Sequence, residues 1–337
     1  MQTPSSKTGK LILGTEEELF ARIIDNKHPF KRLNEILDFK TLVAPMRATY
    51  STLGANGIDA ECGLKALLVQ FWENYSDREM EKAVRENLAV RWFCGFGLSD
   101  ETPDHSYFGK LRKRIGTKRV ADFFTDVNKT LEAKGLFGNV FTFIDASSII
   151  SKTALWEERD RAIADGAERL NNKNVADYTA DTDARWGAKS KTNIWFGHKR
   201  HNAVDMRYGL IKKVAVTAAN VQDFAVVKNI APKEGTVYMD KMYDTKKTDC
   251  ILRALGLHPS TLRKNNNPLK NHALDCFRSG IRMPFESTFS KQSKRARYRG
   301  HVKVLMQCFF EAIVLNLKKA AKLLFGAQPL PAVCLTR

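Results

Sequence analysis

The hydrophobic pattern of this 337-residue chain changes its period near Gly138, and that change limits the folds open to it. Before Gly138, apolar residues recur at helical spacing, as in the stripe at positions i, i+3, i+4, i+7 and i+8 that runs from Leu64 to Trp72. After it, the run Val140–Ser147 is β-branched and aromatic, which is typical of a buried strand. The pattern therefore predicts a helical region followed by a region built around a sheet.

Capping signals divide the helical region into separate helices. Ser76–Glu79 has the form of a capping box, so a helix is expected to begin there. Asp104 predicts the start of another helix, which Gly116 interrupts, and Thr117 can begin a further helix that ends near Gly135. This pair of helices is a candidate helix-turn-helix DNA-binding element, and a packing and dimerisation bundle is the alternative. The basic residues around its turn are Lys110, Arg112, Lys113, Arg114, Lys118 and Arg119.

The second region has the element order of a mixed α/β domain. We therefore expect a helical region over residues 1–137, a mixed α/β domain over 138–326 and a loose tail over 327–337. The residues between the first strand and the next, 152–191, are polar and are expected to form a long loop with some helix. The remaining predicted elements are strands over 193–205, 210–217, 237–240 and 257–262, and helices over 243–255, from Pro284 onward and over 301–324.

Positive charge is concentrated near the C-terminal end of the chain. The net charge is +18, and residues 260–337 hold 15 Lys and Arg against three acids. Such a segment indicates a polyanionic partner such as nucleic acid, because each phosphate contact releases condensed counterions. A solubilising surface, or a surface that binds anionic lipid, would carry the same excess of positive charge.

Nothing in the sequence predicts a membrane or secretory protein. No apolar run approaches the ~20 residues needed to span a bilayer. Met1–Gly14 also lacks the apolar core of a signal peptide. The six cysteines are spread singly with no C-x-x-C pair, which argues against a zinc knuckle or a disulfide framework. We therefore expect a cytoplasmic protein with reduced thiols.

Three carboxylates have sequence contexts that favour metal chemistry. Asp145 interrupts an apolar strand, Asp240 ends a short strand, and Glu286 lies in the basic segment at the start of a predicted helix. A carboxylate in an apolar strand costs several kcal/mol unless it is paired, hydrogen-bonded or bound to a metal. Mg²⁺ prefers oxygen ligands, and two such ions about 3.5–4 Å apart support in-line phosphoryl displacement. Each acid also has a structural interpretation, and Asp244 is a rival ligand to Asp240.

At these residues the chain resembles the DDE transposases of bacterial insertion sequences, specifically the "insertion sequence five" type. The likeness extends over roughly Leu11 to Leu324. Phe143–Ala146 resembles the family's first-aspartate strand, Met239–Asp244 its second-aspartate block and Phe285–Phe289 its glutamate block. Further similar segments are Asp59–Phe96, Pro103–Ser106, His198–Asp205, Thr217–Asp223, Arg295–Gly300 and Asn316–Lys319.

The resemblance implies a ribonuclease-H-like mixed sheet with flanking helices over residues 138–326, preceded by an all-α N-terminal region. It implies that Asp145, Asp240 and Glu286 form a metal-binding triad for two Mg²⁺ or Mn²⁺ ions. The separations of 95 and 46 residues leave no room for a large inserted domain before Glu286. His201 has a family-like position near the site, although a hydrogen-bonded structural histidine is the alternative.

The chain departs from the Tyr-Arg-Glu-Lys signature of related transposases. Arg282 matches the arginine, whereas Ser279 and Ser293 stand at the tyrosine and lysine positions, with Lys294 next to the latter. Guanidinium groups match phosphate oxygens well, so the arginines of the following turn are candidate DNA contacts. The candidates in this part of the chain are Arg282, Lys294, Arg295, Arg297 and Arg299.

The function implied is metal-dependent cleavage of the ends of an insertion sequence, followed by strand transfer into target DNA. The expected partners are the terminal inverted repeats, target DNA and further copies of the chain in a dimer or higher assembly at the bacterial nucleoid. A metal-dependent nuclease without joining activity and a non-catalytic DNA-binding protein are the alternatives.

Overall fold

The structure is a computed structural model, and it describes residues 15–50, 57–153 and 155–326. The described residues form two compact units. One comprises those of Met1–Val43 and Tyr50–Leu111, and the other those of Ala44–Thr49 and Arg112–Arg337. The tail expected over residues 327–337 lies outside the described residues.

The first unit is helical, as the sequence predicts. Thr15 caps its first helix by accepting a hydrogen bond from the Glu18 amide, and the capping box of Ser76 and Glu79 is present. Phe30 and Phe93 stack in its core with ring centroids 4.8 Å apart. The helices before the long α7 are α1 (Glu16–Ile23), α2 (Pro29–Ile36), α3 (Phe39–Arg47, which ends in the second unit), α4 (Ala60–Trp72), α5 (Asp77–Glu86) and α6 (Leu88–Phe93).

Helix α7 (His105–Ala133) runs from the first unit into the second. Asp104 accepts hydrogen bonds from the amides of Ser106 and Tyr107, and Gly116 is non-helical with φ 73° and ψ 158°. The predicted cap and the predicted break are both confirmed. Beyond the break, the Asn128 amide donates to the Ile211 carbonyl at 3.0 Å. The sheet-containing unit thus begins inside α7, although the sequence pattern changes only at Gly138.

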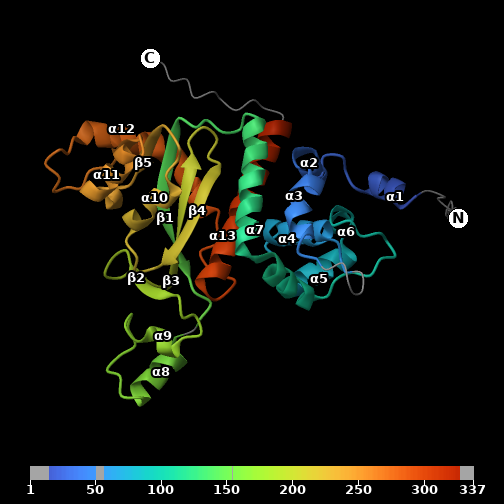
Figure 1. Ribbon diagram of the computed structural model, residues 1–337, viewed down its shortest axis with the longest axis horizontal. Coiled ribbons are helices and arrows are strands. Elements are labelled where there is room, and N and C mark those ends of the chain that lie inside the picture. Colours follow the sequence, from blue (N-terminus) through green and yellow to red (C-terminus); the bar gives the residue numbers. More distant parts are fainter. Residues whose placement is uncertain (1–14, 51–56, 154, 327–337) are drawn as a thin grey trace, which may run out of the picture. The chain divides into compact units, whose positions relative to one another are not determined.

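The second unit is built on a six-stranded mixed sheet (Figure 1). Its strand order is β2-β3-β1-β5-β6, and β4 also pairs with β3. β3 is antiparallel to β1, β2 and β4, whereas β1, β5 and β6 are parallel. This arrangement confirms the expected mixed α/β fold. The strands are β1 (Phe141–Ile150), β2 (Arg185–Ala188), β3 (Ile194–Asp205), β4 (Ile211–Ala218), β5 (Thr236–Met239) and β6 (His258–Thr261).

Helices cover both faces of the sheet. The 3₁₀ turn η1 (Asp223–Val226), α10 (Val227–Ile230) and α11 (Lys246–Ala254) pack on the face that carries Ile144 and Met239. Helix α12 (His272–Ser290) packs on the face that carries Phe143 and Tyr238. Helix α13 (His301–Phe325) packs on the same face, against Ile149 and Val216. The 3₁₀ turn η2 (Lys241–Tyr243) directly follows β5.

The prediction that a helix begins at Pro284 is wrong. Helix α12 begins at His272, and Pro284 lies inside it. Asn271 supplies the N-cap by accepting a hydrogen bond from the Leu274 amide at 3.1 Å. Pro284 is exposed, so the helix accommodates the ring at the cost of one internal hydrogen bond.

The segment between β1 and β3 contains α8 (Trp156–Ala164), α9 (Val175–Tyr178) and β2, and its two helices extend beyond one end of the sheet (Figure 1). This segment also caps α13, whose own N-cap residue is Gly300. The Gly300 amide donates to Asp181 at 3.0 Å, and the His301 amide donates to Asp183 at 2.8 Å. The inserted segment therefore satisfies helix-terminal N–H groups that glycine leaves unpaired.

Candidate active site

The strand register brings Asp145 and Asp240 side by side. The parallel ladder of β1 and β5 pairs Ile144 with Met239, so the next residues along the two strands are the two aspartates. Alternation along the strands puts both carboxylates on the sheet face that α12 covers. The pKa of Asp145 is raised to about 6, mainly by burial and also by the negative charge of Asp240, against the opposing effect of the backbone hydrogen bond from Ala146. The site therefore holds concentrated and poorly compensated negative charge.

An amide oxygen lies on the same face, next to these carboxylates. Asn202 of β3 is directly opposite Asp145 in the antiparallel ladder and is fully buried. Its Nδ2 donates to Gln292 Oε1 at 2.6 Å, whereas its Oδ1 has no hydrogen-bond partner among the described residues. Two carboxylates and one unpaired amide oxygen, with neither thiolate nor imidazole, form a donor set that suits a hard cation such as Mg²⁺ or Mn²⁺.

Glu286 lies on α12, the helix that covers this face of the sheet, and is paired with an arginine. Arg282, one helical turn earlier on α12, contacts Glu286 with Nη2 and Oε1 3.3 Å apart. The same guanidinium lies 5.2 Å from the ring centroid of Phe143 and partly offsets the charge of Asp145. The Glu286 side chain is 52% exposed. Across the described residues, no three His, Cys, Asp or Glu side chains are gathered closely enough to hold a metal ion.

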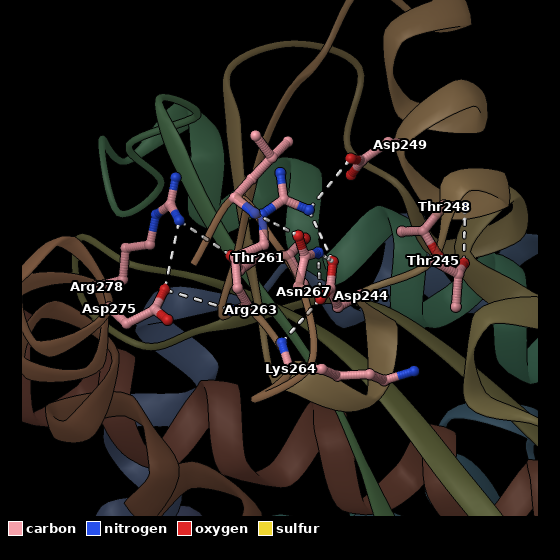
Figure 2. Close-up of polar contacts among 11 residues, drawn as sticks. Asp244, Thr245, Thr248, Asp249, Thr261, Arg263, Lys264, Asn267, Asp275 and Arg278 are labelled. Carbon is pink, nitrogen blue, oxygen red and sulfur yellow. Dashed lines mark hydrogen bonds and ion pairs between the residues drawn. The ribbon is translucent and has the colours of Figure 1, made fainter. Parts of the chain in front are cut away.

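Asp244, the alternative to Asp240 as a metal ligand, forms hydrogen bonds to a different part of the structure. It accepts hydrogen bonds from the Arg263 guanidinium at 2.7 Å, from the Lys264 amide at 2.8 Å and from the Asn267 side chain at 2.9 Å (Figure 2). Burial alone raises the pKa of Asp244, but these hydrogen bonds outweigh it and hold the pKa below its usual value. The carboxylate is thus committed to the loop that follows β6.

The candidate phosphate-binding turn is attached to the strand that carries Asp145. The Ile150 amide at the end of β1 donates to the Lys294 carbonyl, and the Ala296 amide donates back to the Ile150 carbonyl, both at 2.8 Å. Lys294, Arg295 and Arg299 are exposed, and Arg297 is half-buried. The turn therefore presents basic side chains from a position fixed relative to the carboxylates.

The basic residues predicted around the α7 break divide between the two units. Lys110 belongs to the first unit, whereas Arg112, Lys113 and Arg114 belong to the second. Lys110, Lys113 and Arg114 are exposed. The guanidinium of Arg112 lies 4.9 Å from the ring centroid of Tyr298, which connects α7 to the basic turn.

His201 lies on the other face of the sheet from Asp145. It pairs with Ala146 in the β1–β3 ladder, which puts its side chain on the face covered by α10 and α11. It is fully buried, and its Nε2 lies 2.9 Å from the Thr217 hydroxyl. Burial lowers its pKa to about 4. This geometry favours the structural interpretation over an auxiliary role at the carboxylates.

Sequence reasoning did not single out Asn202, Gln292 or the buried Arg200. Arg200 forms an ion pair with Glu311 of α13 and donates to the Ser293 carbonyl at 2.6 Å. The run of five consecutive polar residues from His198 to Asn202 in β3 was the available signal. Only the register between β1 and β3 shows that Asn202 and Arg200 share a face with Asp145, and Gln292 reaches that face through its hydrogen bond with Asn202.

Two family models match the chain. Residues 140–317 match a model described as a transposase DDE domain, and residues 17–114 match one described as a transposase domain (DUF772). The chain therefore belongs to the DDE transposases. The two matches in this order identify it as a transposase of the insertion-sequence type.

A cryo-EM structure of a piggyBac transposase synaptic complex with hairpin DNA is a distant structural neighbour. The identity is 9% and the TM-score 0.35, over 83% of this chain and 71% of that chain.

No helix among the described residues has the length and apolarity to cross a membrane.

Proposed function

We propose that this transposase cleaves the ends of its insertion sequence and joins them to target DNA, using two Mg²⁺ or Mn²⁺ ions held by Asp145, Asp240 and Glu286. The proposal rests on the adjacency of Asp145 and Asp240 just beyond the last residue pair of the parallel β1–β5 ladder. When bound, the ions activate the attacking oxygen and stabilise the leaving oxygen of an in-line displacement.

Asp145 and Asp240 form the fixed part of the site because Asp145 belongs to β1 and Asp240 directly follows β5. Their charges repel each other, and burial raises the pKa of Asp145, so cation binding relieves an existing electrostatic cost. Asn202 Oδ1 adds a buried acceptor beside Asp145. Glu286 completes the donor set after it separates from Arg282, which then offers its guanidinium to a DNA phosphate.

One set of residues serves both chemical steps. Water is the nucleophile when the element end is cut, and the resulting 3′-hydroxyl is the nucleophile when target DNA is attacked. Both are attacks of oxygen on phosphorus, so the same carboxylates apply to each.

DNA positioning is assigned to basic residues on α12, on the turn before α13 and on α7. Arg282, Lys294, Arg295, Arg297 and Arg299 flank the carboxylates, and Lys110, Arg112, Lys113 and Arg114 lie on α7. We further propose that residues 1–137 bind DNA, dimerise or do both, and that residues 138–326 are the catalytic domain. An element has two ends, so a dimer or higher assembly on DNA at the bacterial nucleoid is expected.

The test is Asp145→Asn assayed for Mg²⁺-dependent cleavage of a duplex that carries one element end. Cleavage should be lost, while Asp160→Asn, at an exposed acid of α8, should cleave normally. Near-normal cleavage by Asp145→Asn would end the proposal. Pre-cut ends that are not joined by the wild-type protein would favour a nuclease without joining activity. DNA binding without cleavage, unaffected by metal or by loss of Glu286, would favour a non-catalytic protein.

A further inference from the structure

The loop that follows β6, residues 262–270, leaves the sheet beside Asp240. The parallel ladder pairs Met239 with Thr261, and the Leu262 amide donates to the Met239 carbonyl at 3.1 Å. Asp240 and Leu262 are therefore neighbours at the same edge of the sheet. Any group that approaches Asp240 from this edge also approaches the loop.

The loop is held in place from two sides. Asp244 binds the Arg263 guanidinium, the Lys264 amide and the Asn267 side chain (Figure 2). Asp275 of α12 accepts a hydrogen bond from the Arg263 amide at 3.3 Å. A loop ordered in this way loses little conformational entropy when it binds a partner.

The same contacts leave two positive charges uncompensated. The Arg263 guanidinium is paired with Asp244 at 2.7 Å and with Asp249 at 3.4 Å. Lys264 and Lys270 have no ion pair within the described residues, and the Lys264 ammonium extends away from the Asp244 cluster (Figure 2). The loop thus offers two cations in a segment that leaves the sheet beside Asp240.

Between these cations the loop exposes an apolar side chain. Leu269 is 76% exposed, the largest value for a big hydrophobic residue in the part of the chain described. Its backbone is restrained because its amide donates to Asn267 Oδ1 at 3.0 Å, and the ring of the preceding Pro268 fixes the φ of that residue. A single exposed leucine is ordinary, but a leucine fixed between two lysines matches the apolar wedges that proteins insert between DNA bases.

We propose that residues 264–270 form a DNA-binding loop in which Lys264 and Lys270 contact phosphates near the cleaved bond and Leu269 packs between adjacent bases. This inference rests on the proposed function, which puts DNA at Asp240. DNA is the occupant that the charges favour, since a second copy of this chain also carries +18 and would bring like charge to the loop.

The first experiment measures affinity for a duplex spanning one element end, without divalent metal, as a function of salt. Lys264→Gln/Lys270→Gln in the full chain should weaken binding several-fold and lower the salt slope by about 2, one unit for each lost phosphate contact. Lys228→Gln, at an exposed lysine of α10, is the matched control. An unchanged slope in the double variant, with unchanged thermal stability, would overturn the phosphate contacts.

The second experiment uses the same duplex with 2-aminopurine placed at each position around the cleaved bond. Wild-type protein should increase the fluorescence at one position, and Leu269→Ser should abolish that increase without changing the salt slope. No increase at any position would overturn the base contact. A shift in sedimentation on Lys264→Gln/Lys270→Gln without DNA would indicate a second copy as the occupant and count against the proposal.

Neither the salt slope nor the fluorescence increase depends on cleavage of the DNA. Asp145→Asn should keep the fluorescence increase while losing cleavage. If Asp145→Asn cleaves normally, the proposed metal mechanism fails whatever the loop does. If the loop variants match wild type while Asp145→Asn is inactive, only the loop inference fails.

Discussion

Arg282 and Glu286 lie one turn apart on α12 and form an ion pair with Nη2 and Oε1 separated by 3.3 Å. The positive charge of the same guanidinium also lowers the pKa of Asp145. One arginine therefore attracts two of the proposed metal ligands. Binding of a cation and pairing with Arg282 thus compete for the same carboxylates.

Arg282→Gln should therefore bind Mn²⁺ more tightly than the wild type in the absence of DNA, because the competing charge is gone. Its affinity for element-end DNA should fall, because a guanidinium available to phosphate is lost as well. Calorimetric titration with Mn²⁺ and a DNA-binding isotherm measure the two effects. Lys291→Gln, at an exposed lysine just after α12, is the control. Weaker Mn²⁺ binding by Arg282→Gln would contradict the competition.

Asp145→Asn should make the metal-free protein more stable at neutral pH. The carboxylate is partly buried beside Asp240, and its pKa is raised to about 6, so its ionised form is disfavoured in the folded state. Replacing it with a neutral isostere should raise the free energy of unfolding by about 1–3 kcal/mol. Wild-type protein should gain stability from added Mg²⁺, and the variant should gain little. Thermal melts with and without Mg²⁺ measure this, and an equal Mg²⁺ effect in both proteins would remove Asp145 from the proposed ligands.

The sequence predicted much of the second unit because local signals were strong there. The apolar run around Phe143, the hairpin turn after Asp205 and the long apolar pattern of α13 each produced the expected element. The start of α12 was missed because Pro284 was interpreted as the first residue of a helix, whereas the actual N-cap is Asn271. The capping of α13 by Asp181 and Asp183 was also missed, since these contacts join residues more than 100 positions apart.

The candidate site was predictable only in part, for a similar reason. Asp145 and Asp240 stood out because an acid is costly within or at the end of an apolar strand. Asn202 did not, because its place beside Asp145 depends on the register of a long-range strand pair. The ion pair that engages Glu286 depends on which face α12 presents to Phe143, and no periodicity in the sequence specifies that packing.

His201 should make the folded state less stable in mild acid. Burial lowers its folded-state pKa from the ordinary histidine value of 6.5 to about 4, so the unfolded chain binds a proton that the folded chain does not. This histidine should therefore cost no stability above about pH 6.5 and progressively more as the pH falls toward 4. His201→Gln should flatten this loss by up to about 3 kcal/mol near pH 4. Urea unfolding at several pH values measures it, with His258→Gln, at an exposed histidine, as control. Parallel pH curves for wild type and His201→Gln would show that the imidazole is not the source.

Asp183→Ala should weaken the N-terminus of α13 and loosen the basic turn before it. The Asp183 carboxylate accepts the His301 amide at 2.8 Å, and Gly300 has no side chain to replace it. Loss of an N-terminal cap of this kind costs about 1 kcal/mol. Hydrogen exchange should accelerate at the amides of residues 296–304, and affinity for element-end DNA should fall, because the exposed Arg295 and Arg299 lose their fixed position. Asp160→Ala, at an exposed acid of the same inserted segment, should change neither exchange nor affinity. Unaltered exchange in Asp183→Ala would mean that the inserted segment does not support the turn.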